Sequence, residues 1–230
     1  MQRRAWIALA AAVTASGIGA ATALPAGETE DARPATPPGR LAPLEPPDPA
    51  LRMLDSRSLG LPHRGTLVRG VRLPPRGEHF ATWDPVRRRS PNRWWRRYGN
   101  DYLIRMVLRV ARRHSGADPE PPPPMLVGDL SRPRGGEFGR RFGGLGHSSH
   151  QNGLDVDVYY PRRDGRPAPP RTTRQVDIRL AQRLVDLFVA AGAETVLVGP
   201  HLPLNGPRGV VKPWPHHDNH LHVRILNPVP

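Results

Sequence analysis

The chain has 230 residues, a formal net charge of +14 and no cysteine. The absence of cysteine excludes disulfides, thiolate metal sites and a cysteine-acylated lipoprotein anchor, so any metal must be held by histidine, carboxylate or water. The positive charge is almost all arginine, with Lys212 the single lysine, and the arginines are scattered rather than set on one helix face. With 30 prolines, this composition favours a coding bias over attraction to a polyanion, and we predict no specific nucleic-acid partner.

The N-terminus has the features of an export signal. Arg3 and Arg4 precede the apolar segment Trp6–Ala20, which is short for a membrane span, and Ala21-Thr22-Ala23 offers a small-x-small cleavage site. The arginine pair also resembles a twin-arginine signal; a general-pathway signal and an uncleaved anchor are the alternatives. We expect residues 1–23 to be a signal peptide.

Residues 24–55 are rich in proline, alanine, glycine and charge, which predicts a flexible linker. The remaining residues 56–230 are long enough for one domain with its own core. We therefore predict an exported protein, periplasmic or associated with the cell wall, without a stable membrane span after signal cleavage. Nothing in the pattern indicates an oligomeric state.

Within the domain, hydrophobic periodicity predicts an α+β fold, with a small, mostly antiparallel sheet and two main helices packed on it. The helices are expected at Tyr98–His114 and Thr173–Ala191, where apolar residues recur every three or four positions and a glycine follows. The other expected elements are a short helix at Ala50–Leu59 and strands at Thr66–Leu73, Met125–Val127, Asp155–Val158, Glu194–Val198 and His220–Ile225.

Two histidine-containing stretches indicate a metal site. In Gly146–Val158, His147 and His150 lie in a Gly/Ser turn, and an alternating run then places Asp155 and Asp157 on one face of a strand, with aliphatic residues on the other. Carboxylates beside a buried face need a partner, and imidazole together with carboxylate suits zinc.

The second stretch lies near the C-terminus. His220 and His222 are two residues apart, so their imidazoles share one face of a strand. If this strand lies beside the first one, these two histidines converge with His150 and Asp157. Three protein ligands and one open position are typical of catalytic zinc, with a fourth group as general base. Spacing alone does not decide which of His220 and His222 binds the metal.

Several short motifs lie between about Ser58 and Ile225: Gly128-Asp129, Gly146-His147, Ser149-His150-Gln151, Gly153–Asp157, Pro213-Trp214 and His217 with His220–Arg224. In these motifs the chain resembles the penicillin-insensitive murein endopeptidases. The more general frame of His, six residues, Asp, then His-x-His is shared with lysostaphin-type peptidases, D-Ala-D-Ala peptidases and the hedgehog signalling domain.

This resemblance implies a zinc endopeptidase that cuts D-alanyl–diaminopimelate cross-links in peptidoglycan, which would be its partner. By position, His150, Asp157 and His222 match the zinc ligands, and His220 matches the general base. The remaining motif residues match positions that line or support the site, including a second metal or an oxyanion: His147, His217, Asp155 and Asp129. The charged loop after Asp129 departs from the family pattern.

Local interpretations compete with these roles. His147 could instead cap its turn, His217 could hydrogen-bond a backbone carbonyl and orient His220, and Asp155 could pair with an arginine. For the whole protein, the alternatives are a D-Ala-D-Ala-type carboxypeptidase of the same metal class, a zinc-containing non-catalytic cell-wall binding module, and a secreted nucleic-acid enzyme or binder. The remaining histidines are expected to be solvated or locally bonded: His63, His79, His114 and His201.

Overall fold

The structure is a computed structural model, and it describes residues 54–116, 122–138 and 147–228. The predicted signal peptide, nearly all of the predicted linker and part of the loop before His147 lie outside these ranges. The boundaries 1–23, 24–55 and 56–230 therefore stay predictions. Within the described ranges, we find no helix with the length and apolar character that crossing a bilayer requires.

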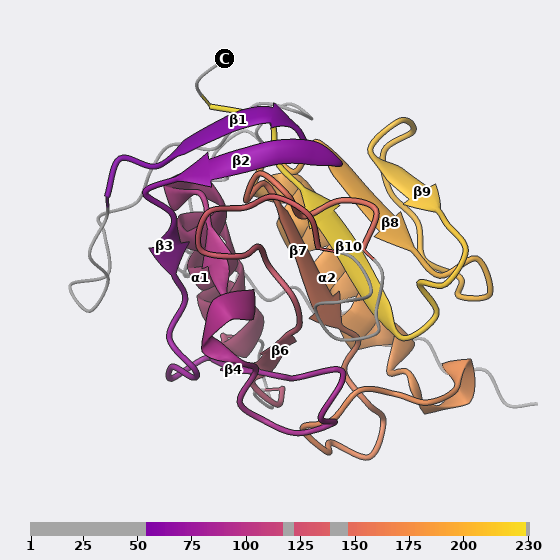
Figure 1. Cartoon of the computed structure of the whole chain (residues 1–230). Helices are drawn as coiled ribbons and strands as arrows, with labels where there is room; N and C mark the ends of the chain where they lie inside the picture. Colours follow the sequence, from indigo (N-terminus) through magenta and orange to yellow (C-terminus); the bar gives the residue numbers. More distant parts are fainter. Residues whose placement is uncertain (1–53, 117–121, 139–146, 229–230) are drawn as a thin grey trace, which may run out of the picture. The chain divides into compact units, whose positions relative to one another are not determined.

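A six-stranded mixed sheet organises the domain, in the order β4-β6-β7-β10-β8-β9 (Figure 1). The central pairs β6-β7, β7-β10 and β10-β8 are antiparallel, and the two edge pairs β4-β6 and β8-β9 are parallel. In sheet order, the strands are Phe80–Thr82, Met125–Val127, Asp155–Tyr159, His220–Arg224, Thr195–Val198 and Val211–Pro213.

The α+β class and the two helices are confirmed, but the sheet is larger and more mixed than expected. The sequence did not indicate β4 and β9, because each has only three residues and offers no run of alternation long enough to recognise. Two further small sheets were also not expected: the hairpin of β1 (Arg57–Leu61) with β2 (Arg64–Val68), and the pair of β3 (Val71–Arg72) with β5 (Tyr98–Gly99).

The predicted short helix at Ala50–Leu59 is wrong where the structure describes it, because residues 57–59 belong to strand β1. The expected strand Thr66–Leu73 is divided. It breaks after β2 at Arg69, which has a φ of +50°, and Gly70, before β3 (Val71–Arg72) continues. Strand β3 pairs with β5 (Tyr98–Gly99), so the residues expected to begin the first helix are extended.

Helix α1 (Asp101–Ser115) and helix α2 (Ile178–Ala190) both begin later than predicted, and the residue before each start caps the helix. Asn100 accepts a hydrogen bond from the Tyr102 N–H, and Asp177 accepts one from the Leu180 N–H. These side chains satisfy backbone donors that a helix leaves unpaired at its N-terminus. A 3-10 turn at Thr173–Gln175 precedes α2.

The two central strands, β7 and β10, have one face in the core and the other face at the candidate site. Val156 and Val158 of β7, together with Leu221 and Val223 of β10, are fully buried in a core shared with residues of both helices. Side chains alternate along a strand, so the aspartates of β7 and the histidines of β10 project from the opposite face. The expected alternation is confirmed, and it places the polar residues on the sheet face away from the helices.

Candidate metal centre

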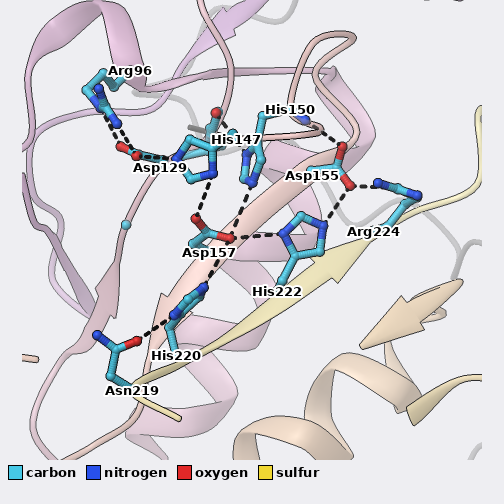
Figure 2. A network of polar contacts seen from close by, with 12 residues as sticks. Arg96, Asp129, His147, His150, Asp155, Asp157, Asn219, His220, His222 and Arg224 are labelled. Carbon is cyan, nitrogen blue, oxygen red and sulfur yellow. Dashed lines mark hydrogen bonds and ion pairs between the residues drawn. The ribbon is translucent and has the colours of Figure 1, made fainter. Parts of the chain in front are cut away.

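Strands β7 and β10 are neighbours, as expected, and their register sets the geometry of the site. His222 lies directly opposite Asp157, and His220 lies opposite Tyr159. His222 Nδ1 is 3.0 Å from Asp157 Oδ1, whereas His220 Nε2 is 3.9 Å from the same oxygen (Figure 2). The structure therefore brings both histidines to one carboxylate, with His222 the nearer.

His150 approaches Asp157 from the turn before β7. Its backbone is left-handed, with a φ of +68°, a conformation that is uncommon for a residue with a side chain. Two hydrogen bonds hold it there: the backbone N–H donates to Asp155 Oδ2 at 3.1 Å, and ring Nδ1 donates to the Leu130 carbonyl at 3.0 Å. Nε2 is left buried without a hydrogen-bond partner among the described residues, 3.3 Å from Asp157 Oδ1.

His147 completes a compact group with His150 and Asp157. Its Nε2 donates to Asp129 Oδ2 at 2.8 Å, and its Nδ1 lies 3.8 Å from Asp157 Oδ2. One ligand atom from each of His147, His150 and Asp157 lies within 4.8 Å of the others. His147 is thus more than a turn cap in this arrangement, and it joins the centre that the sequence placed around His150.

His220 and His222, like His147 and His150, each have one ring nitrogen that contacts a side chain or carbonyl outside the metal-binding group. Asp155 Oδ1 lies 3.0 Å from His222 Nε2 and also accepts a hydrogen bond from Arg224 Nε at 2.6 Å. His220 Nδ1 is 2.7 Å from Asn219 Oδ1 (Figure 2). Partners of this kind fix the orientation of an imidazole that binds a metal.

His217 lies beside the centre rather than in it. Its Nδ1 donates to the Pro215 carbonyl at 2.7 Å, and its ring centroid is 4.8 Å from that of His220 and 6.0 Å from that of His222. The carbonyl hydrogen bond and the packing against His220 correspond to the local alternative for this residue. The pairing of Asp155 with an arginine, through Arg224, also corresponds to a local alternative.

The surroundings of His220 and His222 favour different protonation states of the two rings. Burial lowers the pKa of His220 to about 4, so its ring is neutral at pH 7. For His222, burial acts against protonation, but the carboxylates of Asp155 and Asp157 outweigh it and raise the pKa to about 9. Ligation through His222 Nδ1 therefore requires loss of a proton.

These donors fit a divalent metal of the zinc type. The observation that tests the fit is His150 Nε2, a fully buried nitrogen that has no hydrogen-bond partner among the described residues and lies beside a carboxylate. Burying such an acceptor without a partner is costly, and a cation among imidazole and carboxylate ligands would remove that cost. Calcium or magnesium would instead favour an all-oxygen set.

The centre lies in an open cleft of about 1670 Å³. Asp157, His147, His220 and His222 line it. The exposed Trp214 also lies on its walls. The walls carry several cationic side chains as well: Arg88, Arg162, Arg166, Arg171, Lys212 and Arg224. Pockets for small ligands usually have volumes of roughly 300–1,000 Å³, so this cleft suits an extended substrate.

Sequence reasoning did not assign Arg96, Phe138, Asn219 or Arg224 to the site. Arg96 is 1% exposed and bonded to Asp129, and Phe138 stacks on His147 with ring centroids 4.9 Å apart. The signal for Arg224 and Asn219 was their position beside the His-x-His pair. Arg96 gave no such signal, because it lies in an Arg/Trp-rich stretch about 50 residues before His147.

One prediction about the other histidines is wrong. His114, expected to be solvated or locally bonded, is fully buried at the end of α1. Neither ring nitrogen has a hydrogen-bond partner among the described residues. Of the remaining histidines, His201 pairs with Asp218 at 2.7 Å, and His63 lines the cleft.

The fold and the site together define a class: an α+β domain whose central strands bring histidines and aspartates together in an open cleft, in a donor set suited to a metal ion. Comparison with known proteins gives the family. Residues 58–194 match the family described as penicillin-insensitive murein endopeptidase, and the chain belongs to this family. The match ends before β10, so the contribution of His220 and His222 rests on the structure.

Two relatives illustrate the extent of the similarity. A penicillin-insensitive murein endopeptidase of Haemophilus influenzae is 28% identical over 190 residues, which cover 71% of this chain and 61% of the relative. One of Escherichia coli O1:K1 is 33% identical over 104 residues, which cover 45% of this chain and 32% of the relative. The chain thus spans less than two thirds of the length of these relatives.

Proposed function

We propose that this protein is a zinc-dependent murein endopeptidase that hydrolyses D-alanyl–diaminopimelate cross-links in peptidoglycan. The observation that carries the proposal is the convergence of imidazole nitrogens on the Asp157 carboxylate at the edge of an open cleft. Family membership supports the reaction class, and the names of the relatives supply the substrate.

In this proposal, His150, Asp157 and His222 hold the zinc ion. When bound there, zinc would lower the pKa of a water molecule and polarise a peptide carbonyl oxygen. The chain's own contribution is to orient these ligands. The Leu130 carbonyl fixes the His150 ring and Asp155 fixes the His222 ring, so each presents its other nitrogen to Asp157.

His220 is proposed as the general base. Its Nδ1 donates to Asn219 Oδ1, so Nε2 is the nitrogen that carries a lone pair toward the cleft, 3.9 Å from Asp157 Oδ1. The ring is neutral at pH 7, since burial lowers its pKa, and it can therefore accept a proton at Nε2. In the same assignment, Asp155 and Asp129 support the histidines. His147 and His217 line the site, with ligation of a second metal as the alternative for them.

The cleft supports a peptidoglycan peptide as substrate. Arg88, Arg166, Arg171 and Lys212 lie along its walls. They would attract the carboxylates of cross-linked stem peptides, because opposite charges raise the local concentration of a substrate. A cell-wall substrate also requires export, which agrees with the predicted signal peptide at residues 1–23.

The test is digestion of purified, cross-linked peptidoglycan, followed by mass analysis of the fragments. The wild-type protein is compared with itself after treatment with a chelator, and again after zinc is restored. We expect cross-linked dimers to be converted into monomers with intact stem ends, in a reaction that the chelator abolishes and zinc restores. His201→Ala, which changes an exposed histidine outside the proposed ligand set, is the matched control and should cleave as the wild type does.

The alternatives give different products. Release of single D-alanine from stem ends, with the cross-links intact, would identify a carboxypeptidase of the same metal class. Retention on peptidoglycan without any zinc-dependent product would identify a non-catalytic binding module. Either result would refute the endopeptidase.

A further inference from the structure

Arg96 is a buried charge that the proposed reaction does not use. It ends the 3-10 turn Trp94–Arg96 and is 1% exposed. Arg96 binds Asp129 through two nitrogens, with Nε 2.6 Å from Asp129 Oδ1 and Nη2 bonded to Oδ2. A buried ion pair of this kind contributes little net stability, because desolvation of the two charges offsets their attraction. The role of Arg96 is therefore better inferred from the side chains that it contacts and holds in place.

The first connection from Arg96 to the centre passes through Asp129. Asp129 receives both nitrogens of the buried Arg96 guanidinium in an ion pair, so it is present as a carboxylate. A carboxylate can only accept hydrogen bonds. The His147 nitrogen that faces it, Nε2 at 2.8 Å, must therefore carry the proton. Nδ1 is left as the nitrogen that faces Asp157 (Figure 2).

The second connection passes through Phe138. The guanidinium carbon of Arg96 lies 4.8 Å from the centroid of the Phe138 ring. The Phe138 ring in turn stacks on the His147 ring, with centroids 4.9 Å apart and an interplanar angle of 16°. Asp129 thus fixes the edge of the imidazole and Phe138 fixes its plane, and both contact the same arginine.

We propose that Arg96 is a positioning residue that acts through Asp129 and Phe138 to hold the His147 ring with Nδ1 directed at the group formed by His150 and Asp157. The inference rests on the proposed function in one respect: it takes the metal to bind at this group, with His147 Nδ1 as an additional ligand, which is the ligating alternative given above for His147. Figure 2 shows the contacts in sequence, from Arg96 to Asp129, from Asp129 to His147 and from His147 toward Asp157.

The test uses zinc alone as the probe. Arg96→Lys keeps the positive charge but loses the planar, two-nitrogen contact. Arg93→Lys is the matched control, because Arg93 also pairs with a buried carboxylate, Asp84 at 2.7 Å, and lies 4.8 Å from the Trp95 ring centroid. Zinc affinity is measured by competition with a chromogenic chelator, and the His147 tautomer by the ring ¹⁵N shifts of the metal-free protein.

We expect Arg96→Lys to weaken zinc binding at least about tenfold, as is typical when a partner behind a metal ligand is changed. The His147 ring signals should also move away from the Nε2–H form. Arg93→Lys should change neither. Zinc affinity within twofold of the wild type together with unchanged ring signals in Arg96→Lys would overturn the proposal.

A double-mutant cycle separates positioning from general destabilisation. In a His147→Ala background, Arg96→Lys should cause no further loss of zinc affinity, whereas an equal loss in both backgrounds would overturn the proposal. If Arg96→Lys does not fold, Phe138→Leu retains the ion pair and removes the stacked ring. It should still loosen the His147 ring, and an unchanged ring would count against the proposal. A wild type that binds zinc but cleaves no peptidoglycan would refute the proposed function and leave the Arg96 result intact.

Discussion

His114 should make the protein sensitive to acid at a buried position that does not line the cleft. Its side chain is fully buried at the end of α1, and neither ring nitrogen has a hydrogen-bond partner among the described residues. Burial, reinforced by the charge of Arg183, lowers the pKa of His114 from 6.5 to about 4. The folded protein therefore takes up a proton here much less readily than the unfolded chain does.

Because the pKa of His114 is lower in the folded protein than in the unfolded chain, the free energy of unfolding decreases as the pH falls. Above pH 6.5 the ring is neutral in both states and has no effect on the free energy of unfolding. As the pH falls below 6.5, only the unfolded chain becomes protonated, so stability is lost until the folded state also binds the proton near pH 4. At about 1.4 kcal/mol for each pKa unit, the full loss is about 3 kcal/mol. By the same linkage, the loss is about 2 kcal/mol at pH 5.

The assay is urea unfolding of the wild type and of His114→Leu at pH 7 and pH 5. Other groups titrate in the same range, so the informative quantity is the difference between the two proteins. We expect the wild type to lose about 2 kcal/mol more than His114→Leu between these pH values. His201→Leu, at a histidine whose side chain is 74% exposed, is the control and should follow the wild type. Equal acid dependence of His114→Leu and the wild type would refute the reasoning.

Four further substitutions test the site and the sheet. His220→Ala should retain zinc and lose about 10²–10⁴-fold in peptidoglycan cleavage, whereas His222→Ala should lose zinc; metal analysis and turnover together check this, and the reverse pattern would exchange the two roles. Asp155→Ala should weaken zinc binding by about 10–100-fold, because His222 Nε2 loses its carboxylate partner; an affinity equal to that of the wild type would contradict this. Leu221→Ala, at a fully buried position of β10, should cost about 2–5 kcal/mol in urea unfolding, and a cost below 1 kcal/mol would show that β10 is not packed on the core as described.

The central pair of strands could be predicted because its signal is local. Alternation along β7 and β10 determines which residues face the core, and the histidines and aspartates could therefore be placed on the opposite face before the strands were paired. The other sheet members were harder to predict. Strands β4 and β9 have three residues each, and their pairing depends on contacts with β6 and β8 that no local pattern encodes.

The histidines show a second limit of prediction from the sequence. Ten histidines are present, and the motifs indicated which of them gather around Asp157. The motifs did not indicate that His114 lies in the core without a hydrogen-bond partner among the described residues, since burial depends on how α1 meets α2. They also did not indicate which ring nitrogen of each histidine faces the centre. That choice is made by acceptors such as the Leu130 carbonyl and Asn219 Oδ1.

By itself, the amino-acid sequence determined the α+β class, the two helices, the family resemblance and the residues that could bind a metal, because each depends on short-range periodicity or on a motif. The tertiary structure alone decided the antiparallel register that sets His222 opposite Asp157, and the placement of Arg96 behind Asp129 and His147. The physical reason is that the orientation of an imidazole depends on hydrogen bonds and ring contacts from segments far apart in the chain. Such contacts exist only once the domain has folded.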